Sequence, residues 1–192
     1  MKEDKNNLEK RLFIAIDIPE KVKNQIYHFT ADLFDKDRGI RAVPASNIHV
    51  TLRFLGNTDI SKIQKIGNAV KMTADSLKKF RYRMTGRVSA FPSFKRARVV
   101  FMEIGDGDTQ ISGIYNLLDN NLSKIKIRKE SRKFIPHITI ARIRDKRSIE
   151  KFTGGNPAGP DRWLDCNGIT LFESKLRSQG AEYCVIGRFS LK

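Results

Sequence analysis

Two of the three histidines in this 192-residue chain begin the same four-residue pattern. His49 opens the segment HVTL and His137 opens HITI, so a threonine, Thr51 or Thr139, follows each histidine two residues later. Alternate side chains of a β-strand lie on the same face. Each segment therefore predicts a strand with an imidazole and a hydroxyl on one face and apolar side chains on the other.

A pair of imidazoles supplies what the hydrolysis of a phosphodiester needs. In-line displacement at phosphorus requires a base beside the attacking water and an acid beside the leaving oxygen, on opposite sides of the phosphate. Histidine has an ordinary pKa of about 6.5, so near neutral pH one copy can be neutral while the other is protonated. Threonine hydroxyls can donate hydrogen bonds to the non-bridging oxygens and stabilise the charge that develops there.

The motifs also have simpler interpretations. A single histidine in an apolar strand most often packs or hydrogen-bonds without taking part in chemistry, and only the repetition at equivalent places favours a function. A zinc site needs three or four clustered ligands, and neither motif has a further ligand at a usual spacing. We therefore expect no metal and no cofactor. The third histidine, His28, has no counterpart and is interpreted as a surface or boundary residue.

The elements around the motifs follow the same order twice along the chain. An apolar, β-prone run at residues 11–19 is followed by a helical pattern and by the strand of the first motif. A similar run at 97–104 is followed by a helical pattern and by the strand of the second motif. The motif histidines lie 88 residues apart, as do Phe13 and Phe101 in the two opening runs. The helical patterns consist of Val22, Ile26, Phe29 and Leu33 in the first unit and Ile111, Tyr115, Leu118 and Leu122 in the second.

The sequence predicts further helices and strands after each of the two repeated units. An amphipathic pattern over 63–77 precedes a β-prone run at 80–91, and a short helix near 148–152 precedes runs at 163–176 and 182–191. The segment TGGNPAGPDR between them is expected to be a loop. We expect each unit to be extended by its own additional helix and strands.

This repeat predicts an α+β fold with two similar lobes related by an approximate two-fold axis. The lobes would consist of mostly antiparallel sheet with outer helices, and they would face each other across a central cleft. The whole chain, residues 1–192, is expected to form a single bilobal domain.

The composition indicates a globular chain with strong positive charge. Hydrophobic residues make up 40% and charged residues 30%, while 37 Lys and Arg against 21 Asp and Glu give a net charge of +16. This charge favours a nucleic acid or phosphorylated partner, although a basic surface alone does not require one. No apolar run approaches the length of a membrane span, and the start of the chain does not resemble a signal peptide. We expect a cytoplasmic monomer, with Cys166 and Cys184 reduced and partly buried.

Two basic segments stand out. In KIKIRKESRK, residues 124–133, Ile125 and Ile127 alternate with basic residues, which predicts an edge strand with one buried face. The segment FKRAR, residues 94–98, is expected to be a loop. Either segment could follow the backbone of a polyanion, but lysines on edge strands also serve simply to prevent aggregation.

The ordered set of motifs resembles that of the two-histidine phosphoesterases, and within them the bacterial and archaeal RNA 2′,3′-cyclic phosphodiesterases, also called 2′-5′ RNA ligases. Besides the two histidine motifs, the resemblance rests on RLFIAIDIP, HVTLRFLG, AFPS with the following ARVVF, PHITIAR, LFESKL and YCVIGRFSL. It covers nearly the whole chain. The resemblance implies a bilobal α+β fold with both motifs in a central cleft, in agreement with the repeat.

The resemblance implies hydrolysis of a 2′,3′-cyclic phosphate at an RNA end to a 2′-phosphomonoester, with weak and reversible 2′-5′ joining in some members. RNA with such an end, tRNA fragments being one candidate, is the implied partner. His49 and His137 would be the acid–base pair, and Thr51 and Thr139 would hold the phosphate. Our assignment takes His137 as the base that activates water and His49 as the acid that protonates the leaving 3′-oxygen.

Two arginines are further candidates for substrate binding. Arg142 matches an arginine of the family's second motif, which implies contact with the phosphate or the neighbouring nucleotide. Simple alternation, however, places Arg142 on the face opposite His137 unless the strand ends or twists there. Arg53 shares the face of His49 and Thr51 by the same alternation.

Two other functions stay open at this point. A cyclic phosphodiesterase that acts on small nucleotides or on cyclic ADP-ribose phosphate could use the same histidines, although the charge of +16 favours RNA. A non-catalytic RNA-binding protein could use the same cleft, but it would have no need of two titrating groups.

Overall fold

The computed structural model describes residues 8–35, 37–153, 158–178 and 180–192. Within these residues one antiparallel sheet has the strand order β7-β4-β5-β6-β3-β1-β8-β9, and the short β2 also pairs with β6. Helices accompany the sheet, so the predicted α+β class is confirmed. The strands are β1 (Glu9–Asp17), β2 (Ile40–Ala42), β3 (His49–Asp59), β4 (Phe80–Phe91), β5 (Ala97–Ile104), β6 (His137–Arg147), β7 (Asp161–Cys166), β8 (Gly168–Arg177) and β9 (Gly180–Ser190).

The pairing of β3 with β6 joins two halves of the sheet, which are the two lobes. One lobe contains β3, β1, β8 and β9, and the other contains β6, β5, β4 and β7. The expectation that each unit is extended by its own strands is therefore wrong, because β4 lies in the second lobe and β8 and β9 lie in the first. A short connection links β4 to β5, so β4 pairs with the strand that follows it. The end of the chain fills the place beside β1.

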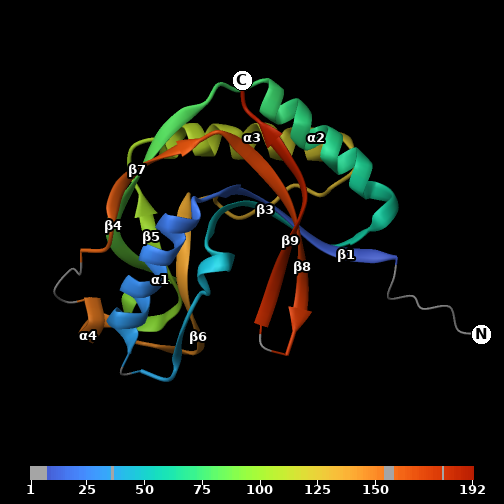
Figure 1. Ribbon diagram of the computed structural model, residues 1–192. Helices are drawn as coiled ribbons and strands as arrows, with labels where there is room; N and C mark the ends of the chain where they lie inside the picture. Colours follow the sequence, from blue (N-terminus) through green and yellow to red (C-terminus); the bar gives the residue numbers. More distant parts are fainter. Residues whose placement is uncertain (1–7, 36, 154–157, 179) are drawn as a thin grey trace, which may run out of the picture.

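The helices cover the lobes from outside. Helices α2 (Ile63–Asp75) and α3 (Asp108–Lys124) pack together, with α2 against β8 and β9 and α3 against β3. Helix α1 (Glu20–Phe34) contacts β2 and β6, and the short α4 (Glu150–Thr153) follows β6. Figure 1 shows α2 and α3 side by side over one lobe and α1 beside the other. The apolar spacing of Val22 and Ile26 on α1 explains its buried face.

The central strand β1 is buried on both faces, which explains why its sequence lacks strict alternation. Leu12, Ile14 and Ile16 belong to the main core under the helices. Phe13 and Ala15 point to the opposite face and form a second cluster. A strand covered on both sides has apolar residues at every position.

The internal repeat is real, but its offset changes between the strands. The pairing places Thr51 opposite Ala15 and Thr139 opposite Phe101. The opening strands therefore correspond with an offset of 86 residues, while the motif strands keep 88. The predicted equivalence of Phe13 and Phe101 is wrong, because the connection to the motif strand is two residues longer in the second unit.

The predicted edge strand at 124–133 is also wrong. Helix α3 continues to Lys124, and the chain then turns, with the amides of Ile125 and Ile127 donating to the carbonyl of Leu122. Both isoleucines pack against the core, so the alternation reflects their anchoring and not a strand.

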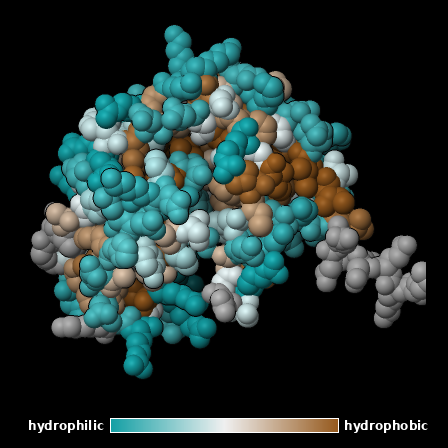
Figure 2. Space-filling model, in the orientation of Figure 1, coloured by the Kyte–Doolittle hydropathy of each residue, from teal (hydrophilic) through white to brown (hydrophobic). Residues whose placement is uncertain are grey.

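The face shown in Figure 2 is mostly hydrophilic, with a hydrophobic patch beside α2. No described helix has the length and hydropathy that a membrane crossing requires.

Candidate active site

The two histidine motifs lie on neighbouring strands at the junction of the lobes. Val50 of β3 pairs with Ile138 of β6 in antiparallel register. In that register His49 lies opposite Thr139, and His137 lies opposite Thr51. The histidines are thus diagonal neighbours on one face, a relation that places such residues roughly 7–8 Å apart. The space between them suits a phosphate group with one imidazole on each side.

Two adjoining cavities hold these side chains. A cavity of about 200 Å³ is lined by His49, Thr51 and Thr139, and by Arg142 and Tyr183. A wider cavity of about 440 Å³ contains His137 together with Thr51. Because Thr51 borders both cavities, the two motifs face a single cleft, as the sequence predicted.

The imidazole of His49 is held from two sides. Its Nε2 lies 2.8 Å from Oγ1 of Thr51, and the backbone of Asn47 forms a further hydrogen bond that favours the protonated ring. The aromatic rings of Phe13 and Tyr183 pack against it, with centroid distances of 4.9 and 5.5 Å. Burial is the main reason why the pKa of His49 falls to about 4, and the charges of Lys23 and Arg142 lower it further.

The setting of His137 is similar. Its Nδ1 lies 2.7 Å from the carbonyl oxygen of Ile135. Ile135 precedes His137 by two residues, and Asn47, whose backbone forms a hydrogen bond with His49, likewise precedes His49 by two residues. When Nδ1–H donates to this carbonyl, Nε2 is the nitrogen left for the cleft. The rings of Phe91 and Phe101 lie 5.2 and 5.1 Å away. Burial lowers the pKa of His137, and the charge of Arg142 acts in the same direction.

Both motif strands contain a β-bulge directly after the threonine. Along β3, Thr51 lies opposite Ala15 and Arg53 lies opposite Ile14, the residue before Ala15, so Leu52 is an extra residue. Along β6, Ile140 is likewise an extra residue between Thr139 and Ala141. A bulge reverses the alternation of side chains beyond it. This explains why Arg142 lines the cleft with His49, although strict alternation would turn it away.

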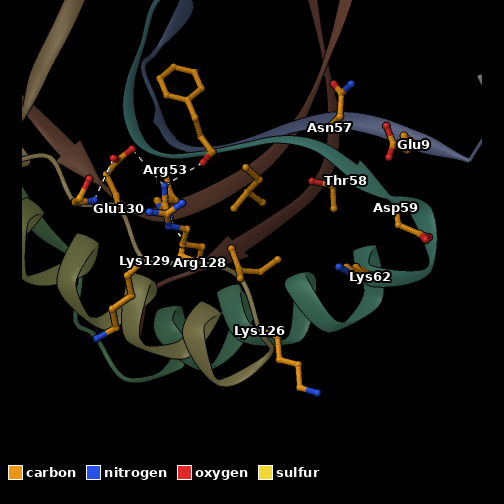
Figure 3. A pocket seen from close by; sticks show the side chains of 14 residues that line it. Glu9, Arg53, Asn57, Thr58, Asp59, Lys62, Lys126, Arg128, Lys129 and Glu130 are labelled. Atoms are coloured by element: carbon orange, nitrogen blue, oxygen red, sulfur yellow. Dashed lines mark hydrogen bonds and ion pairs between the residues drawn. The ribbon is translucent and has the colours of Figure 1, made fainter.

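The same bulge contradicts the predicted orientation of Arg53. Only 8% of Arg53 is exposed, and its Nε donates to Oδ1 of Asp119 on α3 at 3.0 Å. Its Nη1 lies 3.6 Å from a carboxylate oxygen of Glu130, and its Nη2 donates to the carbonyl of Arg128. Figure 3 shows Arg53 beside Glu130 and Arg128, while Lys126 and Lys129 extend away from them. Arg53 borders the wider cavity, but its guanidinium connects β3 to α3 and to the segment after it.

Sequence reasoning missed several residues that line the cleft. Tyr183 stands in the segment YCVIGRFSL, and only the pairing of β9 with β8 brings it beside His49. Phe54 replaces Arg53 on the cleft face because of the bulge, and it is 54% exposed. Arg41 and Asn47 come from the connection between α1 and β3. His28 is exposed on α1, as expected, and lines neither cavity.

The sequence profile of the family described as LigT like Phosphoesterase matches residues 16–101 and 104–183. This chain belongs to that family. The matched residues include both histidine motifs and the strands that carry them. The recognised resemblance to two-histidine phosphoesterases is thereby confirmed.

Named relatives and solved structures agree with this membership. The RNA 2′,3′-cyclic phosphodiesterase of Methanocaldococcus jannaschii is 32% identical over 184 residues, which cover 92% of this chain and 98% of the relative. The enzyme of the same name from Escherichia coli K12 is 30% identical and covers 94% of this chain and 96% of its own. The crystal structure of E. coli LigT with 3′-AMP has a TM-score of 0.81 at 25% identity, covering 96% and 99% of the two chains.

Among the residues that the structure describes, no group of three or more His, Cys, Asp or Glu side chains is placed to hold a metal ion. Cys166 is buried and Cys184 is partly buried, and neither forms a disulfide in the described part of the chain.

Proposed function

We propose that this protein hydrolyses the 2′,3′-cyclic phosphate at an RNA end to a 2′-phosphomonoester, with His49 and His137 as the acid–base pair. The observation that carries this proposal is the diagonal placement of the two imidazoles, each opposite the threonine of the other motif. The relatives named RNA 2′,3′-cyclic phosphodiesterase support the substrate. The complexes of E. coli LigT with 3′-AMP and with phosphate show that a family member binds these groups.

In the proposed reaction, His137 removes a proton from water while the water oxygen bonds to phosphorus. The bond from phosphorus to the 3′-oxygen breaks, and His49 donates its proton to that oxygen. His137 borders the wider cavity, which we assign to the attacking water, whereas His49 lies in the smaller cavity, which we assign to the terminal nucleoside. Thr51 and Thr139 donate hydrogen bonds to the non-bridging oxygens. Attack by a 5′-hydroxyl in place of water would give the 2′-5′ joining reaction, which stays a prediction.

The lowered pKa of His137 suits a base, whereas the lowered pKa of His49 suits an acid only when the substrate is bound. With an empty cleft, burial keeps His49 largely neutral near neutral pH. A phosphate anion beside an imidazole favours the protonated form and raises its pKa. We therefore propose that substrate binding makes His49 take up a proton from the solvent, and that His49 later donates this proton to the leaving 3′-oxygen.

The arginines take different parts in this proposal. Arg142 lies in the cavity of His49, and its charge acts on both histidines, which supports contact with the phosphate or the adjacent nucleotide. Arg53 instead stabilises the cleft wall through Asp119 and Glu130. A substrate contact by Arg53, a cytoplasmic location, a monomeric state and tRNA fragments as substrates stay predictions from the sequence.

The proposal is tested by incubating the protein with an RNA oligonucleotide that ends in a 2′,3′-cyclic phosphate. Comparison with synthetic standards should identify a 2′-phosphate as the new end. The His28→Ala variant, in which an exposed histidine outside the cleft is replaced, should retain this activity. Opening of free cyclic nucleotides without hydrolysis of the oligonucleotide would instead indicate a small-molecule enzyme. Binding without hydrolysis of either substrate would indicate an RNA-binding protein.

A further inference from the structure

The cleft contains an arginine pair, of which the proposed reaction assigns a substrate contact to Arg142 but no part to Arg41. Arg41 of β2 lies directly opposite Arg142 of β6, and both line the cavity of His49. Like charges directly opposite each other on neighbouring strands destabilise a sheet. In the part of the chain that the structure describes, neither guanidinium takes part in an ion pair, although basic residues elsewhere do. Such an arrangement is favourable when an anion binds between the two side chains.

The arginine pair lies beyond the histidine motifs along the same strand edge. Strands β3 and β2 both pair with β6, β3 at Ile138 and β2 from Ala141 to Ile143. Because of the bulge after Thr139, the β5 partners of Thr139 and Arg142 are only two residues apart, which corresponds to about 7 Å along a strand. Long arginine side chains can shorten this distance. The pair is therefore close to the phosphate position between the histidines but separate from it.

A fixed wall closes the other side of the cavity. Gly180, Ala181 and Tyr183 at the start of β9 line it opposite β2. Nδ2 of Asn47 donates to the carbonyl of Ala181 at 2.7 Å, so the segment that leads into β3 holds this hairpin in place. One cavity is thus lined by His49, by Tyr183 and by both arginines, so a nucleoside bound in it would lie near the histidine and near the arginine pair.

We propose that Arg41 and Arg142 bind the phosphodiester on the 5′ side of the terminal nucleotide of the RNA. This inference rests on the proposed function and adds a second anion site to the same cleft. An RNA end carries its cyclic phosphate on one side of the last ribose and a phosphodiester on the other. A free nucleoside 2′,3′-cyclic phosphate lacks the second anion. The arginine pair therefore gives preference to RNA ends over cyclic nucleosides.

The experiment compares kcat/KM for three substrates. These are adenosine 2′,3′-cyclic phosphate, the dinucleotide ApA ending in the same cyclic phosphate, and that dinucleotide with a neutral methylphosphonate linkage. The wild-type protein should prefer the charged dinucleotide over both others. Arg41→Gln should reduce this preference by roughly 10-fold or more, the effect expected for loss of a charge-assisted hydrogen bond. Arg41→Lys, which keeps the charge, should restore part of the preference.

Matched controls separate the possible outcomes. Arg11→Gln removes an exposed arginine outside the cleft and should keep the wild-type preference. A preference that Arg41→Gln leaves unchanged, or a wild-type protein with none, would overturn the second anion site. An equal loss for all three substrates would overturn it too, because Arg41 would then act on the cyclic phosphate. Failure of the wild-type protein to open any of the three would instead contradict the proposed function.

Discussion

Replacement of His49 by glutamine should remove a pH-dependent part of the free energy of unfolding. The pKa of His49 is about 4 in the folded protein, against an ordinary value of 6.5. Between these values the unfolded chain binds a proton that the folded chain does not. This contribution to stability is therefore fully present above pH 6.5 and is lost as the pH falls toward 4.

The size of the effect follows from the two pKa values. For a single group, the linkage relation gives a loss of about 1.4 kcal/mol at pH 5.5 and about 2.5 kcal/mol at pH 4.5, relative to neutral pH. The free energy of unfolding of the wild-type protein would be measured by urea denaturation at about pH 7.5, 5.5 and 4.5. The His49→Gln variant should lose less stability over this range by these amounts.

The matched control for this prediction replaces His28. His28→Gln removes an exposed imidazole on α1, so it should lose stability with falling pH in parallel with the wild-type protein. If His49→Gln also changed in parallel with the wild-type protein, His49 would not be held neutral by burial.

Three further predictions follow from the same geometry. Arg53→Met leaves the buried carboxylate of Asp119 without its partner, so urea denaturation should show a free energy of unfolding lower by about 3–5 kcal/mol. Adding Asp119→Leu should recover most of this loss. An unchanged stability of Arg53→Met would contradict the role assigned to Arg53. Thr51→Ala and Thr139→Ala should each lower kcat by roughly 10- to 100-fold, the effect of losing one hydrogen bond to a charged group, and so less than loss of a histidine, because the proton transfers survive. In steady-state kinetics, KM for an RNA oligonucleotide should rise steeply with salt while KM for a mononucleotide changes little, and equal salt dependence would exclude extended binding along the basic surface.

The sequence predicted the parts of the fold that depend on periodicity and repetition. The alternation around His49 and His137 placed both motifs on strands, and the repeated order of elements placed these strands in similar lobes. Sequence order could not reveal that the lobes exchange strands. The exchanged strands β4 and β8 pair with β5 and β1. Their alternation of apolar and polar residues predicts a strand but does not indicate the strand with which it pairs.

The largest errors arose where one residue changes a register. The bulge after Thr51 turns Arg53 toward α3, and the bulge after Thr139 turns Arg142 into the cleft. No glycine or proline at these positions signals a bulge. The isoleucines of 124–133 alternate as in a strand but anchor a turn, and among the described residues no strand pairs with this segment.

The central claim, that His49 and His137 act as one acid–base pair without metal, is tested most directly by single-turnover hydrolysis. The substrate is an RNA with a 2′,3′-cyclic phosphate end, in the presence of a chelator, and the proteins are the wild type, His49→Ala, His137→Ala and the double variant. The wild-type rate should not change with chelator, and each single variant should lose roughly 10²- to 10⁴-fold. The double variant should lose far less than the product of the two single losses, because groups that act together are not additive. A chelated wild type that is inactive until a divalent ion is added, or a His137→Ala protein with an unimpaired rate, would contradict the account.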